Sequence, residues 1–288
     1  MRLATVLAIA LIAVAAPAYA ETSITLNARD GAPTVEAQIN GRPVRLEIDP
    51  RLPDVLVLSQ AAAERLRVRR LPFAGVGVGI EGSDATIRGR LARPRLVFTD
   101  EDARAFAGVF PVPVTNRADG VIGPGVLPHD VITIELGPAL AAPREITFAL
   151  QNADNWQVNA PVGGETLRVS FDVTNRASVF NRSAARLYDA SGAIPAAGEL
   201  AELPLILGLR TLMQPVNTEL SVEGLALGAA FARTNAPLLG AIEEDAIVVE
   251  ASGDAPPPSL IVGREALAAC SSISVNRRTR RLTLVCAG

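Results

Sequence analysis

The stretch LEID, residues 46–49, closes an apolar strand on an aspartate and leads into a second apolar run, VLVL, residues 55–58. The same order returns in the second half of the chain, where VSFD, residues 169–172, leads into SVF, residues 178–180. Alternation of apolar and polar residues over such short runs is typical of half-buried β-strands. Each half is therefore predicted to contain the same unit, a strand that ends on an aspartate and a second short strand.

The repeated order continues after these strands. Residues 59–66 (SQAAAERL) and 181–187 (NRSAARL) each place a serine or an asparagine before alanine-rich turns, a pattern that predicts a short helix. Later in each half a glycine follows a short apolar run, in GVIG at residues 120–123 and in LIVG at residues 260–263, and another strand comes next. A recurring order of similar parts indicates an internal repeat. We therefore predict two homologous lobes.

The repeat sets the predicted domain organisation. The boundary falls near the polar residues 151–155, with Gly163-Gly164 as the alternative. The first position places residues 21–155 in an N-terminal lobe and residues 156–288 in a C-terminal lobe. Short alternating runs separated by turn residues fill both lobes, and helical patterns are few. The sequence therefore predicts an all-β fold of sandwich or barrel type with short helices.

Residues 1–20 have the pattern of a secretory signal peptide. Arg2 supplies the positive charge, and residues 3–16 form an apolar run that is too short for a helix to cross a hydrocarbon core of ~30 Å. Ala18-Tyr19-Ala20 is a small-x-small cleavage site. We expect cleavage after Ala20, a periplasmic or secreted mature protein, and no integral membrane segment after cleavage. An uncleaved membrane anchor is the alternative.

The composition excludes several classes of function. All 27 basic residues are arginine, so the sequence lacks a Walker A lysine, a Schiff-base lysine and a Ser-x-x-Lys nucleophile. One histidine and two cysteines are too few for a Cys/His zinc site or an iron–sulfur cluster, so we expect no metal and no cofactor. Aromatic residues make up 4% and the net charge is -3, which argues against a nucleic-acid partner.

The two cysteines fit an oxidising compartment. Residues 272–276 and 281–286 alternate as strands around a turn at residues 277–280, and across this hairpin Cys270 and Cys286 face each other to within one residue. We predict a disulfide bond between Cys270 and Cys286 that ties the C-terminal strand down. Two free buried thiols are the alternative.

These features together resemble the retropepsin-like aspartic proteases. In the first lobe, Ile39-Asn40-Gly41 and Asp49 are similar to the opening of the family pattern, and residues 118–123 (ADGVIG) are similar to its closing element. In the second lobe, Phe171-Asp172 and residues 260–263 (LIVG) stand in the corresponding places. The resemblance covers nearly all of the mature chain. It implies two tandem retropepsin-like β-barrel lobes with short helices and a cleft between them.

The resemblance also implies a pair of catalytic aspartates, Asp49 and Asp172, with one from each lobe. In an active aspartic protease two such carboxylates share one proton, activate a water molecule and polarise the scissile carbonyl. The family continues each aspartate with Thr-Gly, whereas here Pro50-Arg51 follows the first and Val173-Thr174 follows the second. An arginine beside an aspartate favours the ionised carboxylate and so works against a shared proton.

A glycine-rich segment lies within the first lobe. Gly77, Gly79 and Gly82 fit G-x-G-x-x-G, but residues 85–91 alternate as a strand, whereas a dinucleotide fingerprint needs a helix there. We interpret these glycines as part of a hairpin over the cleft, analogous to the family's flap. They are candidate binding residues, as are the two loop residues Arg51 and Thr174.

Two functions remain open. The first is an exported cell-envelope protein whose degenerate lobe pair is non-catalytic and holds an extended peptide or protein in the inter-lobe cleft by strand addition. The second is a divergent aspartic endopeptidase that uses Asp49 and Asp172 as its proton-sharing dyad. Because both lobes lie in one chain, we expect a monomer.

Overall fold

The computed structural model describes residues 21–79, 85–99, 101–152, 156–162, 164–189, 196–205, 209–217, 221–222, 224–239, 247–249 and 256–288. Residues 1–20, which carry the predicted signal peptide, and the candidate residue Gly82 lie outside this part of the chain. What was expected of them therefore stays a prediction.

Strands dominate both halves of the chain. The first half contains β1 (Ser23–Asn27), β2 (Thr34–Ile39), β3 (Arg42–Ile48), β4 (Val55–Ser59), α1 (Gln60–Arg65), β5 (Arg70–Gly79), β6 (Ala85–Ala92), β7 (Arg95–Val97), β8 (Asp102–Arg104), β9 (Phe106–Phe110), β10 (Gly120–Ile122), η1 (Pro124–Val126), β11 (Val131–Glu135) and β12 (Pro143–Ala149). The second half contains β13 (Val158–Val162), β14 (Glu165–Phe171), β15 (Ser178–Phe180), α2 (Arg182–Asp189), β16 (Ala201–Pro204), β17 (Arg210–Val216), β18 (Ser221–Val222), β19 (Leu225–Ala226), β20 (Ala230–Leu239), β21 (Ile247–Val249), β22 (Ser259–Val262), β23 (Cys270–Asn276) and β24 (Arg281–Ala287). The predicted all-β class with short helices is confirmed.

One arrangement of five strands occurs twice. It is β2-β3-β10-β4-β9 in the ten-stranded sheet and β13-β14-β22-β15-β20 in the seven-stranded sheet. In the first sheet β10, the strand before Gly123, runs parallel to β3 and antiparallel to β4. In the second sheet β22, the strand before Gly263, runs parallel to β14 and antiparallel to β15. The repeat in the sequence is thus a repeat of strand order and direction. Both sheets are open, and over the described residues neither closes into a barrel.

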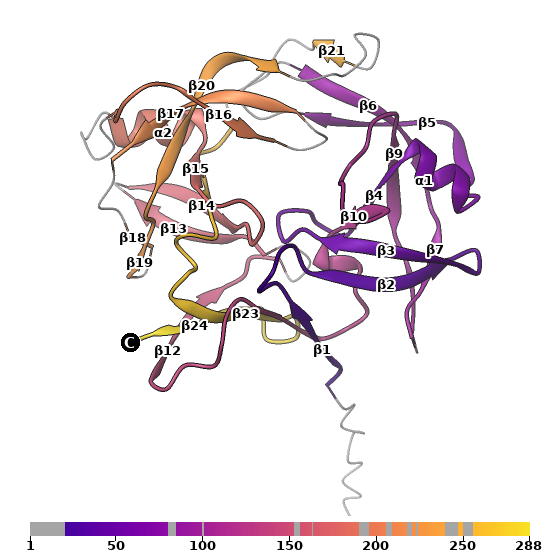
Figure 1. Cartoon of the computed structure of the whole chain (residues 1–288), viewed down its shortest axis with the longest axis horizontal. Coiled ribbons are helices and arrows are strands. Elements are labelled where there is room, and N and C mark those ends of the chain that lie inside the picture. Colours follow the sequence, from indigo (N-terminus) through magenta and orange to yellow (C-terminus); the bar gives the residue numbers. More distant parts are fainter. Residues whose placement is uncertain are drawn as a thin grey trace, which may run out of the picture.

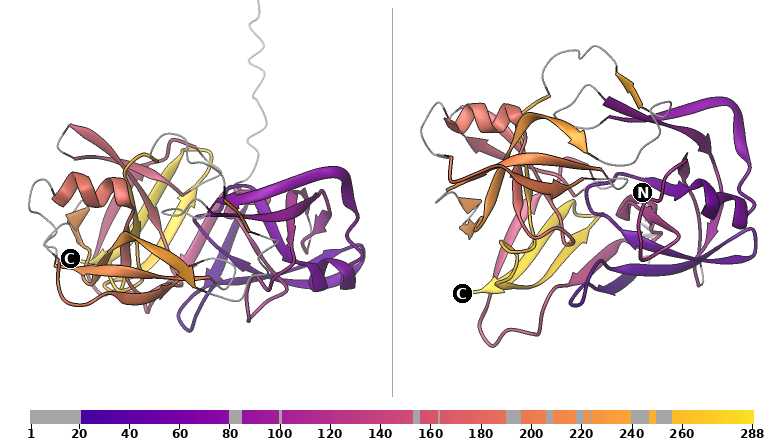
Figure 2. Two further views of the ribbon diagram at one scale, coloured as in Figure 1. Left: turned by 90° about the horizontal axis from the view of Figure 1, so that it is seen from above. Right: turned by 45° about the horizontal axis from the view of Figure 1, so that its top comes forward.

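The two halves meet in a third sheet, with the order β1-β11-β23-β24-β12. Its neighbouring strands β11 and β23 come from different halves and pair antiparallel, from Val131 opposite Asn276 to Glu135 opposite Ser272. Figure 1 shows this sheet at the bottom of the view, and Figure 2 shows the two halves side by side. Buried apolar residues of both halves belong to one continuous core. The shared sheet and core therefore hold the halves against each other.

Both predicted helices are present and begin at polar caps. The Ser59 hydroxyl accepts a hydrogen bond from Ala62 N at 3.2 Å at the start of α1, and Asn181 Oδ1 accepts one from Ala184 N at 2.8 Å at the start of α2. The helices lie on opposite sides of the molecule (Figure 1). Neither they nor any other helix of the described residues is long and apolar enough to cross a membrane.

The predicted disulfide bond between Cys270 and Cys286 is present, and both residues are buried. The hairpin β23–β24 keeps the predicted register, with Asn276 opposite Arg281, and a one-residue shift next to Ser272 brings the two cysteines opposite each other. The bond thus fastens the last strand to the sheet that joins the two halves.

Reduction of this bond is expected to lower the free energy of unfolding by about 3 kcal/mol, because the disulfide closes a short loop, with a sequence separation of 16, in the unfolded chain. Urea denaturation with and without reductant measures the difference. The double variant Cys270→Ala/Cys286→Ala should match the reduced protein and should not respond to reductant. A loss below about 1 kcal/mol would contradict the prediction.

Candidate functional site

Two corresponding loops carry Asp49 and Asp172. Each aspartate directly follows a strand, β3 or β14, and its backbone N–H donates to the neighbouring strand of the repeat. Asp49 N donates to the carbonyl oxygen of Ile122 at 3.1 Å, and Asp172 N donates to that of Val262 at 2.9 Å. The same local connection therefore sets the starting point of both loops.

A glycine after each of these neighbouring strands lets the loop come close. A Cβ atom at Gly123 would lie 1.5 Å from the carbonyl oxygen of Pro53, and one at Gly263 would lie 2.4 Å from the carbonyl group of Ala177. Contacts this short with backbone atoms are impossible for any residue with a side chain unless the loop moves. The two glycines therefore allow the aspartate loops to pack on the sheets.

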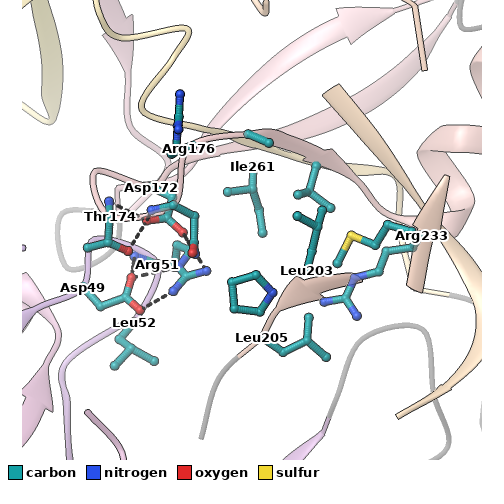
Figure 3. A pocket seen from close by; sticks show the side chains of 15 residues that line it. Asp49, Arg51, Leu52, Asp172, Thr174, Arg176, Leu203, Leu205, Arg233 and Ile261 are labelled. Atoms are coloured by element: carbon teal, nitrogen blue, oxygen red, sulfur yellow. Dashed lines mark hydrogen bonds and ion pairs between the residues drawn. The ribbon is translucent and has the colours of Figure 1, made fainter. Parts of the chain in front are cut away.

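The guanidinium of Arg51 lies between the two carboxylates (Figure 3). Its Nε donates to Oδ1 of Asp49 at 2.9 Å and its Nη2 donates to Oδ2 at 2.7 Å, which is a bidentate pair. Its Nη1 lies 2.8 Å from Oδ2 of Asp172. Asp49, Arg51 and Asp172 therefore form one connected group, called the Asp–Arg–Asp triad below.

Asp172 is the buried member of the triad, with 1% of its surface exposed. Besides Arg51, its Oδ1 accepts hydrogen bonds from Thr174 N at 2.8 Å, Thr174 Oγ1 at 2.7 Å and Asn175 N at 3.0 Å. Its Oδ2 also accepts one from Asn175 Nδ2 at 2.6 Å. All of these groups donate, so the loop is built to hold a negative charge.

The electrostatics of the triad favour the charged forms of Asp172 and Arg51. Burial disfavours the charged form of Asp172, but the charge of Arg51 and the donors of Thr174 and Asn175 outweigh burial, so the pKa of Asp172 lies below its ordinary value. Burial also disfavours charge on Arg51, yet the carboxylates of Asp49 and Asp172 raise its pKa above the ordinary value. A proton-sharing dyad needs one neutral carboxyl group. The triad supplies a cation at that place instead.

Two cavities meet at the triad. The larger has a volume of about 560 Å³, and apolar side chains of the second half face the triad across it (Figure 3). The smaller has a volume of about 200 Å³ and a wall of valines from the first half. Leu205 lines both cavities. The apolar side chains lining the larger cavity include Val179, Leu203, Leu205, Met213 and Ile261, and the valines are Val57, Val78, Val114 and Val121.

The structure brings both aspartates together with Arg51 and Thr174. Gly77 and Gly79 lie near the end of β5, and Val78 between them lines the smaller cavity. The glycines themselves are not among the residues that line either cavity. The predicted hairpin is formed by β5 and β6, which pair antiparallel.

Sequence reasoning missed Asn175 and the apolar wall of the larger cavity. Asn175 stands three residues after Asp172, and an amide so close to a strand-end aspartate is a recognisable signal of hydrogen bonding within a loop. Leu203 and Leu205 lie in and just after β16, in a segment without any motif. Only the tertiary structure could assign them to the cavity.

Comparison of the sequence with models of protein families and with curated proteins found no match. The likeness to aspartic proteases thus depends on the residues of this chain alone. Within the described residues, no group of three or more His, Cys, Asp or Glu residues is placed to hold a metal ion.

Proposed function

We propose that this chain is an exported cell-envelope protein with a retropepsin-like lobe pair, non-catalytic, that holds an extended peptide or protein segment in the cleft between its lobes. The observation that carries the proposal is the contact of the Arg51 guanidinium with both carboxylates. An aspartic endopeptidase keeps its two carboxylates about 3 Å apart with one proton between them. A cation that bridges the pair leaves no such proton, which makes the endopeptidase the weaker candidate.

The lobe pair is supported by the repeat. Each half contains the same five-strand order, an aspartate at the end of the second of these strands, and a glycine that packs against the aspartate loop. Export is supported by the targeting pattern of residues 1–20 and by the disulfide bond, since such bonds persist in oxidising compartments. A single chain with both lobes supports a monomer.

Peptide binding is supported by the surroundings of the larger cavity. β16 stands at one end of the strand order of the seven-stranded sheet, and its residues Leu203 and Pro204 line the cavity. An edge strand beside an apolar cavity offers backbone groups for an added strand and a site for its side chains. An extended peptide that pairs with β16 would place alternate side chains toward the triad.

The proposal predicts that peptides selected from a random library bind the full chain and stay intact between pH 3 and 8. Leu203→Arg should weaken binding at least about tenfold, because it places a charge in the apolar wall of the cavity. Fluorescence anisotropy of a labelled peptide measures affinity, and mass spectrometry measures cleavage.

Leu200→Arg is the matched control, because Leu200 is 47% exposed and does not line the cavity. It should leave the affinity unchanged. If no peptide is selected, or if both variants bind equally, the binding function is wrong. Cleavage that disappears in Asp49→Asn would establish the endopeptidase instead.

A further inference from the structure

We propose that an exposed face of the β5–β6 hairpin, together with the segment that leads into β5, docks on a lipid bilayer that contains anionic phospholipids. The residues that carry this inference are Arg67, Arg69, Phe73, Arg88 and Arg90, called the basic hairpin patch below. The patch does not line the two cavities at the triad. The inference therefore goes beyond peptide binding and does not depend on it.

Phe73 is the apolar element of the patch. Its side chain is fully exposed, at 102% relative to a reference residue, whereas phenylalanine is ordinarily among the more buried residue types. It stands where the pairing of β5 with β6 is interrupted, between Arg70 and Gly75, and its φ is 60°. A bulky residue in the left-handed region costs free energy, and such strain persists where it serves a function. The bulge thus holds an aromatic ring out in solvent.

Four exposed arginines lie near Phe73 in the sequence or on the partner strand β6. Arg67 and Arg69 precede β5 and are exposed. Arg88 and Arg90 are two residues apart on β6, so their side chains leave the sheet on the same face. Their partners on β5 are Gly77 and Gly75, which carry no side chains to cover the guanidinium groups.

Carboxylates do not neutralise the patch within the described part of the chain. Exposed arginines nearby are paired, as Arg65 is with Asp119 at 2.6 Å. In contrast, no described acidic side chain forms an ion pair with any of the four arginines of the patch. Residues 67–73 and 88–90 contain five arginines and no acidic residue, whereas the whole chain has a net charge of -3. An anionic surface would attract the molecule through this face.

A bilayer suits both parts of the patch at once. An aromatic ring can enter the boundary between headgroups and acyl chains, while guanidinium groups pair with lipid phosphates at the same depth. Each arginine near an anionic bilayer contributes about 1 kcal/mol to binding, and the attraction fades within a Debye length. The four arginines and one exposed ring together therefore suffice for reversible docking.

Co-sedimentation of the full chain with vesicles tests the inference. We expect binding to vesicles of mixed phosphatidylglycerol and phosphatidylcholine, no binding to pure phosphatidylcholine, and release at high salt. Arg88→Gln/Arg90→Gln should lower the partition coefficient about 30-fold. Phe73→Gly should lower it at least about tenfold without loss of thermal stability, because glycine accepts the φ of this position.

Arg280→Gln/Arg281→Gln is the matched control, since it removes the same charge from two exposed residues where the turn of the β23–β24 hairpin enters β24. It should bind vesicles as the wild type does. An equal loss in this control would mean that only total charge matters and would overturn the inference. Absence of wild-type binding to anionic vesicles would overturn it as well, and the patch would then fit an acidic protein instead.

Discussion

Replacement of Arg51 by alanine is expected to lower the free energy of unfolding at pH 7 by about 3–5 kcal/mol. Arg51 is the cation that contacts both carboxylates of the triad, and Asp172 is 1% exposed. Without the guanidinium, Asp172 stays buried as a charge with only hydrogen bonds to compensate it. Removing one partner of a buried ion pair leaves the other charge buried and unpaired, so it lowers the free energy of unfolding far more than removing a surface ion pair does. Chemical denaturation of both proteins measures the difference.

Arg176→Ala is the control for this change. Arg176 lies on the same loop as Asp172, pairs with Glu265 at 2.8 Å and has a side chain that is 84% exposed. Surface pairs contribute roughly 0–1 kcal/mol, so this variant should be nearly as stable as the wild type. If Arg51→Ala costs no more than Arg176→Ala, the triad does not stabilise the fold. The double variant Arg51→Ala/Asp172→Asn should recover part of the loss, because the unpaired charge is gone.

The loss in Arg51→Ala should depend on pH. The pKa of Asp172 is depressed in the folded wild type, so its stabilising contribution is present above the unfolded pKa of about 3.9 and is lost as the pH falls through the folded pKa. The gap in stability between wild type and variant should therefore be widest near neutral pH and should narrow in acid. A gap that stays constant down to pH 3 would show that Arg51 acts through packing alone.

Local patterns were sufficient for much of the fold and part of the site. Alternation located β3 and β14, and the polar residues Ser59 and Asn181 marked the helix starts, because these signals depend on neighbours in sequence. The hairpin register placed Cys270 opposite Cys286 for the same reason. The repeat led to Asp49 and Asp172 as a pair. Their closeness follows from two copies of one strand order facing each other.

Long-range geometry explains what the sequence could not show. An arginine two residues after Asp49 indicated an ionised carboxylate, but its reach to Asp172 depends on how β11 and β23 join the halves. The pairing of β21 with β6 joins distant segments without a shared motif. Leu203 lines the larger cavity because the strand order of the seven-stranded sheet places β16 beside it. Each of these contacts joins segments that are far apart in the chain, and the sequence of one segment contains no signal for its partner.

The repeat predicts that Gly123→Ala and Gly263→Ala are both severely destabilising, by about 3 kcal/mol or more each. The added Cβ would lie 1.5 Å from the oxygen of Pro53 in the first case and 2.4 Å from the backbone of Ala177 in the second. Both contacts are with backbone, which cannot rotate away as a side chain can, so the aspartate loop must shift. A shift of either loop also separates the carboxylates from Arg51, which adds to the cost.

Gly137→Ala is the matched control for this pair, since its Cβ would be 3.5 Å from the nearest backbone oxygen, an ordinary contact. It should change the free energy of unfolding by less than about 1 kcal/mol. Thermal and urea denaturation of the three variants give the comparison. Equal stabilities for all three would mean that the glycines do not hold the loops in place. If the free energy of unfolding falls strongly in only one of Gly123→Ala and Gly263→Ala, the prediction is wrong for the other half. The two halves would then share a strand order but not the dependence on this glycine.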